Sequence, residues 1–124
     1  MRVLIDTSIW INHIRKRDAV LDSLLLEGLA LIHPFVIGEL ALGQFKNREN
    51  VLDHLQRMPK AIDVSDTELL HFIDRLKLFG TGIGLVDAHL LASAKIMQAQ
   101  FWSADIRAVA QARRLGIDYT GSVH

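Results

Sequence analysis

Short apolar runs alternate with longer segments of helical character along the 124-residue chain. The intervening segments repeat apolar residues every three or four positions, which is the period of an amphipathic helix. No two apolar runs are joined by a tight turn, as a β-hairpin requires. The alternation therefore predicts an α/β fold with a central, mainly parallel sheet. The expected strands are residues 3–5, 29–33, 61–64, 101–103 and 117–120.

Capping residues mark the ends of the expected helices. Thr7 or Ser8 is expected to cap the first helix, and Asp18 can cap the second. Ser65 with Glu68 three positions later has the pattern of a capping box. The pattern predicts helices over residues 9–16, 18–28, 34–45, 48–58, 65–76, 85–99 and 105–116.

Composition limits the class of protein. The length suits one domain, so residues 1–124 are expected to form a single unit. The chain has no cysteine, which excludes disulfides, thiol catalysis and thiolate metal sites. The 14 basic and 14 acidic residues cancel, which argues against a strongly basic nucleic-acid-binding protein but leaves the placement of charge open. The longest uncharged stretch, residues 28–38, is too short to span a bilayer, and the N-terminus does not resemble a signal peptide. We expect a cytoplasmic protein with no membrane partner.

Four carboxylates occur in otherwise apolar surroundings. Asp6 and Asp105 follow expected strands, Asp87 lies in the first turn of an expected helix, and Glu39 lies within the apolar segment 35–42. Ligands bind at the carboxyl edge of an open parallel sheet, where such residues can converge. A buried carboxylate needs a basic partner, a proton or a metal ion, and hard divalent cations prefer oxygen ligands. The set therefore indicates a divalent-cation site, although each acid taken alone also fits a helix cap or a half-exposed position.

Other patterns give weaker signals. The six histidines show no paired zinc-type spacing, and His89 is expected to be structural, since it lies on another side of the helix from Asp87. The glycine-rich residues 80–84 match neither a phosphate-binding P-loop nor a dinucleotide fingerprint, so a tight turn or hinge explains them. No nucleophilic serine elbow occurs.

The opening Val-Leu-Ile-Asp-Thr-Ser-Ile-Trp-Ile of residues 3–11 resembles the start of a PIN domain, and specifically of the VapC ribonuclease toxins of type II toxin–antitoxin systems. Residues 36–40, 84–92, 101–105 and 113–117 resemble the later segments of that family, in the same order. The resemblance covers nearly the whole chain. It implies one PIN domain over residues 1–124, with a three-layer α/β/α sandwich and a Mg²⁺- or Mn²⁺-dependent endoribonuclease activity.

The resemblance also implies roles for individual residues and partners. Asp6, Glu39, Asp87 and Asp105 would be the catalytic acids, with Asp6, Asp87 and Asp105 in contact with the metal. Glu39 would orient or activate water, or complete a second metal position. Ser103 occupies a place where the family more often has threonine. The implied partners are an RNA substrate, a cognate antitoxin and a second copy of the chain, in a homodimer or a larger toxin–antitoxin assembly.

Two other functions remain as alternatives. The first is a non-catalytic PIN module that binds RNA or protein, against which the complete set of acids argues. The second is a phosphotransfer enzyme of the haloacid dehalogenase kind, which also places an aspartate after its first strand. That class carries Asp-x-Asp-x-Thr, whereas the segment that begins at Asp6 lacks the second acid. Whether DNA is also cut stays open.

Overall fold

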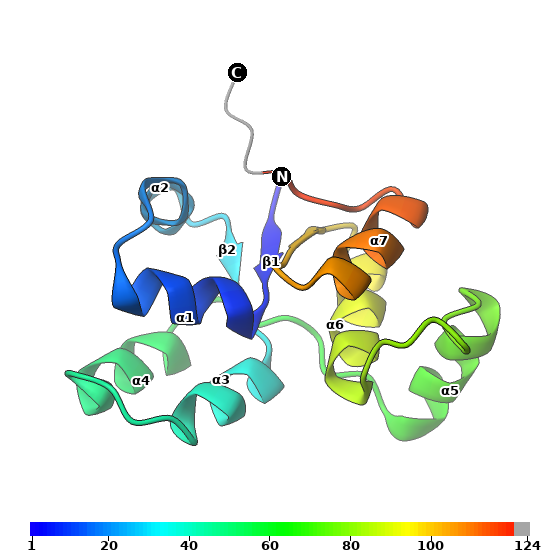
Figure 1. The fold of residues 1–124 in the computed structure, drawn as a ribbon, viewed down its shortest axis with the longest axis horizontal. Coiled ribbons are helices and arrows are strands. Elements are labelled where there is room, and N and C mark those ends of the chain that lie inside the picture. The colour runs from blue at the N-terminus through cyan, green and yellow to red at the C-terminus, as the bar shows by residue number, and fades with distance from the viewer. Residues whose placement is uncertain (121–124) are drawn as a thin grey trace.

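The structure, a computed structural model, describes residues 1–120. Its sheet has three parallel strands, which are β1 (Val3–Ile5), β2 (Ala30–Leu31) and β3 (Gln100–Trp102). The strand order is β2-β1-β3 (Figure 1). Leu4 of the central strand pairs with Leu31 on one side and with Phe101 on the other. Because all three strands run in the same direction, their carboxyl ends open on one edge of the sheet.

Seven helices among residues 1–120 flank this sheet in the α/β/α arrangement that the alternation and the family resemblance predict. In Figure 1 the first four helices occupy one half of the molecule and the last three the other, with the sheet between them. None of the helices in this part of the chain combines the length and apolar character needed to cross a bilayer. The helices are α1 (Thr7–Arg15), α2 (Ala19–Leu26), α3 (Pro34–Ala41), α4 (Arg48–Gln56), α5 (Asp66–Arg75), α6 (Leu85–Ile96) and α7 (Ile106–Arg114).

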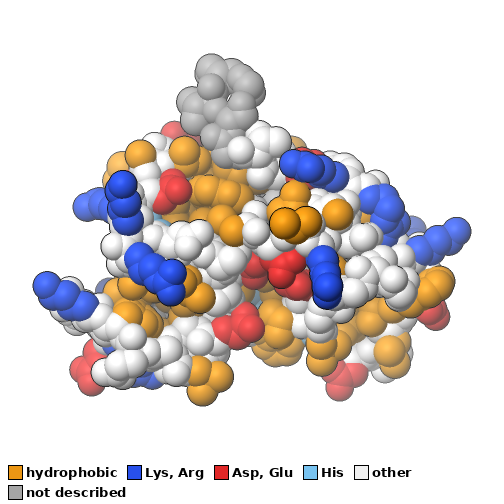
Figure 2. Space-filling view, viewed as in Figure 1, with side chains coloured by type: hydrophobic (Ala, Val, Ile, Leu, Met, Phe, Trp, Pro, Cys, Tyr) orange, Lys and Arg blue, Asp and Glu red, His pale blue; other side chains and the backbone are white. Residues whose placement is uncertain are grey.

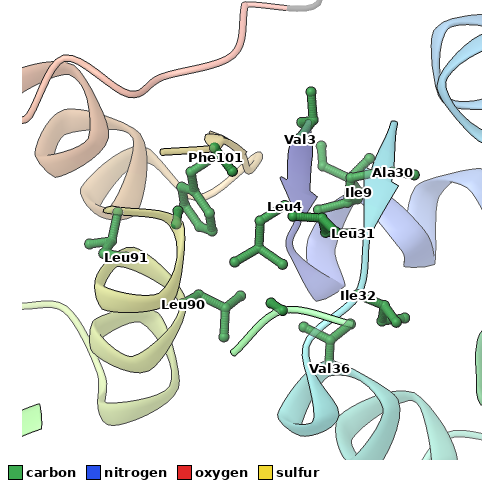
Figure 3. Close-up of a cluster of buried hydrophobic side chains, with 14 of the residues drawn as sticks. Val3, Leu4, Ile9, Ala30, Leu31, Ile32, Val36, Leu90, Leu91 and Phe101 are labelled. Carbon is green, nitrogen blue, oxygen red and sulfur yellow. The ribbon is translucent and has the colours of Figure 1, made fainter. Parts of the chain in front are cut away.

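The hydrophobic core lies between the sheet and the helices on either side. Leu4, Phe101 and Leu90 are essentially inaccessible to solvent, and Figure 3 shows their side chains converging between β1, β3 and α6. Residues 88–94 of α6 are all buried, so the middle of this helix is enclosed on every side rather than amphipathic. A helix packed in this way holds the residues of its first turn, including Asp87, in a fixed place relative to the sheet.

Local signals in the sequence correctly mark most helix ends. Oδ1 of Asp18 accepts hydrogen bonds from two backbone N–H groups of α2, and Ser65 and Glu68 form both halves of the capping box. Gly116 has a φ of 72°, which glycine adopts readily, and the chain turns there after α7. One expectation is wrong: Asp6, and not Thr7 or Ser8, is the N-cap of α1.

Two of the expected strands are absent from the described residues. Residues 61–64 form no strand, because pairing beside β2 consists of a single bridge between Ile32 and Lys60. Ile62 and Asp63 are neighbours and both are exposed, which the alternating sides of a half-buried strand do not allow. Residues 117–120 likewise contribute one bridge, from Asp118 to Phe101, so the sheet has three strands instead of five. The helix that begins at Pro34 ends at Ala41, earlier than expected.

Candidate active site

Asp6 lies at the carboxyl end of β1, and hydrogen bonds fix its side chain in one orientation. The side chain has little access to solvent, since the residue is only 6% exposed. Oδ1 accepts a hydrogen bond from the backbone N–H of Thr7 at 2.8 Å. Oδ2 accepts from Oγ of Ser103 at 2.7 Å and from Oγ of Ser8 at 3.0 Å. Both carboxylate oxygens of Asp6 are therefore held by groups from two segments of the chain.

The two serine hydroxyls also connect Asp6 to the loop that follows β3. Oγ of Ser103 accepts a hydrogen bond from the backbone N–H of Asp105 at 3.0 Å, and Oγ of Ser8 accepts from that of Ala104 at the same distance. A hydroxyl can donate one hydrogen bond while it accepts others, so each serine relays between the backbone and the carboxylate. This arrangement fixes the start of α7 relative to the end of β1. The sequence alone left the role of Ser103 open; the structure shows that its hydroxyl contacts Asp6.

Asp105 and Glu39 reach the same edge of the sheet from two different helices. Asp105 caps α7, with Oδ1 accepting from the backbone N–H groups of Arg107 and Ala108 at 2.9 and 3.2 Å. Glu39 is exposed on α3, and its Oε1 accepts a hydrogen bond from Oγ1 of Thr7 at 2.6 Å. The sequence offered Thr7 only as a helix cap, so its contact with Glu39 is a feature that sequence reasoning missed.

Asp87, in the first turn of α6, has a pKa that depends on its burial and on the charges of the other three acids. Burial raises its pKa from 3.8 to about 6, and the negative charges of Asp6, Asp105 and Glu39 act in the same direction. A hydrogen bond from the Gly84 backbone opposes the shift. The structure therefore brings the four predicted site residues close enough for their charges to interact. Figure 2 shows acidic side chains gathered at the centre of one face, between the two halves of the molecule.

The four carboxylates have no cationic partner within the described part of the chain. None of the ion pairs formed by residues 1–120 includes Asp6, Glu39, Asp87 or Asp105. The nearby guanidinium of Arg107 donates instead to the carbonyl oxygen of Gly82, at 3.3 Å. Clustered carboxylates repel one another unless a cation or a proton compensates them, and a set of oxygen ligands suits Mg²⁺ or Mn²⁺. The donor set therefore fits a hard divalent cation.

A second group of residues meets the distance requirement for a metal site. His33, Asp63 and His89 can each place one ligand atom within 4.8 Å of the others, although the three are far apart in the sequence. However, Nδ1 of His33 accepts a hydrogen bond from the backbone N–H of Phe35 at 3.0 Å. Burial lowers the pKa of His33, so the ring is neutral near pH 7 and carries its proton on Nε2, the atom that faces Asp63. A protonated nitrogen offers no lone pair to a metal, which makes the carboxylate cluster the better cation site.

Comparison with known proteins identifies the family. A model of the PIN domain matches residues 3–115. Ribonuclease VapC32 from two strains of Mycobacterium tuberculosis is 42% identical to this chain over 116 residues, which is 93% of this chain and 94% of the relative.

Solved structures show the same fold. The structure of VapBC-1 from nontypeable Haemophilus influenzae has a TM-score of 0.66 at 16% identity, covering 92% of this chain and 94% of that one. FitAcB from Neisseria gonorrhoeae has a TM-score of 0.60 at 21% identity, covering 90% and 93%. At such identities the structural likeness supports the fold alone. The family match and the 42% identical relative support membership of the family. The resemblance drawn from the acidic segments is confirmed, and the chain belongs to the PIN domain family.

Proposed function

We propose that this chain is a metal-dependent endoribonuclease that hydrolyses RNA phosphodiester bonds and acts as the toxin of a toxin–antitoxin pair. The observation that carries the proposal is the cluster of Asp6, Glu39, Asp87 and Asp105 at the carboxyl edge of the sheet, without a cationic partner among the described residues. The relative that is 42% identical is named a ribonuclease, which supports RNA as the substrate. The PIN domain match leaves the haloacid dehalogenase alternative without support.

PIN-domain nucleases generally use a divalent metal ion, and we assign Mg²⁺ or Mn²⁺ to this site. Asp6, Asp87 and Asp105 would hold the ion, directly or through water. A bound divalent ion lowers the pKa of its water ligand and screens the negative charge that develops on the phosphate. Asp87 has a pKa of about 6, so it must lose its proton before it can serve as a metal ligand. The affinity of the metal-free protein for the ion should therefore increase as the pH rises through this range.

The protein's own groups position the acids for this chemistry. Ser8 and Ser103 hold the Asp6 carboxylate, and Asp105 is fixed at the N-terminus of α7 by two backbone N–H groups. Glu39 is exposed, and its hydrogen bond from Thr7 keeps one of its oxygens turned towards the start of α1. We assign Glu39 the role of orienting the attacking water and accepting its proton, because an exposed carboxylate can exchange protons with solvent after each turnover.

The same proposal extends to partners and location. The names VapBC-1 and FitAcB of the solved neighbours each denote two components, which supports an antitoxin partner for this chain. Large apolar side chains such as Leu42 and Ile106 are 90% and 85% exposed, so partner surfaces are available for an antitoxin or a second copy. We propose a homodimer or a larger toxin–antitoxin assembly in the cytoplasm, in which residues 1–124 form one PIN domain.

The test is a cleavage assay with purified protein and single-stranded RNA. We expect cleavage in Mg²⁺ or Mn²⁺, none in EDTA, and recovery when the metal is restored. Asp87→Asn should abolish cleavage, while Asp74→Asn, which removes an exposed carboxylate from α5, should leave it unchanged. RNA binding without cleavage in any metal would favour the non-catalytic PIN module, and full activity of Asp87→Asn would remove the basis of the site assignment. A single-stranded DNA substrate in the same assay decides whether DNA is also cut.

A further inference from the structure

Two buried histidines outside the acidic cluster face a single carboxylate. His33 is 0% exposed and His89 is 3% exposed. Nε2 of His33 and Nδ1 of His89 are buried and have no hydrogen-bond partner within residues 1–120. Oδ1 of Asp63 lies 3.9 Å from the first nitrogen and 4.0 Å from the second. An unpaired polar atom in the interior is costly, so these two nitrogens and the carboxylate beside them need an explanation.

The hydrogen bonding of His33 determines which of its ring nitrogens can donate a proton to Asp63. Because Nδ1 already accepts the backbone N–H of Phe35, the neutral ring is an N–H donor at Nε2. The carboxylate of Asp63 is an acceptor and lies on the side that Nε2 faces. The distances exceed that of a direct hydrogen bond, and a small rotation of the Asp63 side chain would close the gap. The side chain of Asp63 is 49% exposed, which leaves room for such a rotation.

The three residues come from parts of the molecule that share few other contacts. His33 caps α3, the helix that carries Glu39, and His89 lies in α6 two positions after Asp87. Helix α3 packs mainly on α1 and α4, whereas α6 packs on α5, β1 and β3. The segment between α4 and α5, which contains Asp63, runs from one half of the molecule to the other (Figure 1). The ring of Phe35 in α3 also meets that of His89, with centroids 4.6 Å apart, so the two helices are in contact at this point.

We propose that Asp63 is a positioning residue that holds α3 and α6 together through His33 and His89, and thereby fixes the separation of Glu39 and Asp87. The role rests on the proposed function, because it matters only if Asp87 holds the metal while Glu39 acts on the attacking water. Asp63 itself forms no hydrogen bond or ion pair with Glu39 or Asp87 within residues 1–120. Its effect is to keep two acids from different halves of the molecule in register, so that the water that Glu39 orients would lie beside the cation that Asp87 holds.

The test compares Asp63→Ala, Asp63→Asn and the matched control Asp53→Ala in the full chain. Asp53 is an exposed carboxylate that pairs with Arg57 on the surface of α4 and has no contact with either histidine. Nitrogen-15 NMR of the histidine rings in metal-free protein should show the proton of His33 on Nε2. Exchange of that proton with water should be faster in Asp63→Ala than in the wild type. RNA cleavage at saturating Mn²⁺ should slow about tenfold in Asp63→Ala, the lower end of the effect of residues that orient groups around a metal. Asp63→Asn, which keeps an acceptor oxygen, should recover most of this loss, and Asp53→Ala should cleave RNA as the wild type does.

Wild-type cleavage in Asp63→Ala would overturn the proposal. So would a stoichiometric shift of the His33 Nε2 resonance on addition of Zn²⁺, since that would make the cluster a metal site. If the wild type neither binds Mn²⁺ nor cleaves RNA, the proposed function fails and the positioning role fails with it. Proton exchange at His33 still decides separately whether Asp63 is the acceptor.

Discussion

Replacement of Asp87 by asparagine removes one of four mutually repelling carboxylates and keeps the size and shape of the side chain. In metal-free buffer at pH 7.5 we expect the free energy of unfolding to increase, even though the same variant loses RNA cleavage. The reason is that Asp87 must be ionised at this pH in a half-buried position, where Asp6 and Asp105 oppose its charge. An increase in stability from the loss of a proposed catalytic residue is the signature of a site whose acids are held together against their repulsion.

The size of the effect follows from the pKa of Asp87. A rise from 3.8 to about 6 corresponds to roughly 3 kcal/mol if each unit is worth about 1.36 kcal/mol. Asp87 is only half-buried, so solvent screening reduces this to about 1–2 kcal/mol. For a chain of this length the melting temperature should rise by about 5 °C. Because the pKa is raised in the folded state, the destabilisation is fully present above pH 6 and is lost as the pH falls towards 3.8.

The assay is urea unfolding in EDTA at pH 7.5 and at pH 5.0, with Asp74→Asn as the control for loss of a surface charge. The advantage of Asp87→Asn should shrink by roughly half at pH 5.0, where the wild-type carboxyl is largely protonated in the folded state. Mg²⁺ or Mn²⁺ should stabilise the wild type and reverse the order of the two proteins at pH 7.5, because only the wild type retains the complete site. The reasoning is refuted if Asp87→Asn is no more stable than the wild type in EDTA, or if the difference does not depend on pH.

Substitutions at three further positions separate the parts of the site from the fold. Ser103→Ala should lower the free energy of unfolding by about 1–2 kcal/mol, because Asp6 and the Asp105 N–H both lose a buried partner. Ser103→Thr keeps the hydroxyl, so it should retain the wild-type stability in urea and the wild-type Mn²⁺ affinity by calorimetry. Thr7→Val should reduce the turnover of RNA more than it reduces stability in urea, since it releases the exposed Glu39 side chain; unchanged turnover would show that this hydrogen bond does not matter. Ser65→Ala should cost about 1 kcal/mol of stability by removing the capping box of α5 and should leave RNA cleavage untouched, which combined unfolding and cleavage measurements can check.

Local sequence signals predicted much of this fold because their physical causes act over a few residues. The capping box at Ser65, the cap at Asp18 and the left-handed turn at Gly116 each depend on neighbours within one helical turn. The alternation of strand and helix likewise determined the parallel sheet. The two strand predictions that failed concern the short segments 61–64 and 117–120. The structure has one bridge beside each neighbouring strand there, because strand formation depends on the length of partner strand that the fold places alongside. That information is absent from the segments themselves.

The sequence by itself determined the chemical character of the site, because Asp6, Glu39, Asp87 and Asp105 are acids in apolar surroundings that elements of a parallel sheet can bring to one edge. Only the tertiary structure decided how they are held. The contact of Ser103 with Asp6 crosses 97 positions, that of Thr7 with Glu39 crosses 32, and His33, Asp63 and His89 come from three separate segments. Such contacts depend on the register of β1 against β3 and on the packing of α3 and α6, which no local pattern encodes. The identity of a carboxylate is a property of one position, whereas its orientation and its pKa depend on the groups that the folded chain places around it.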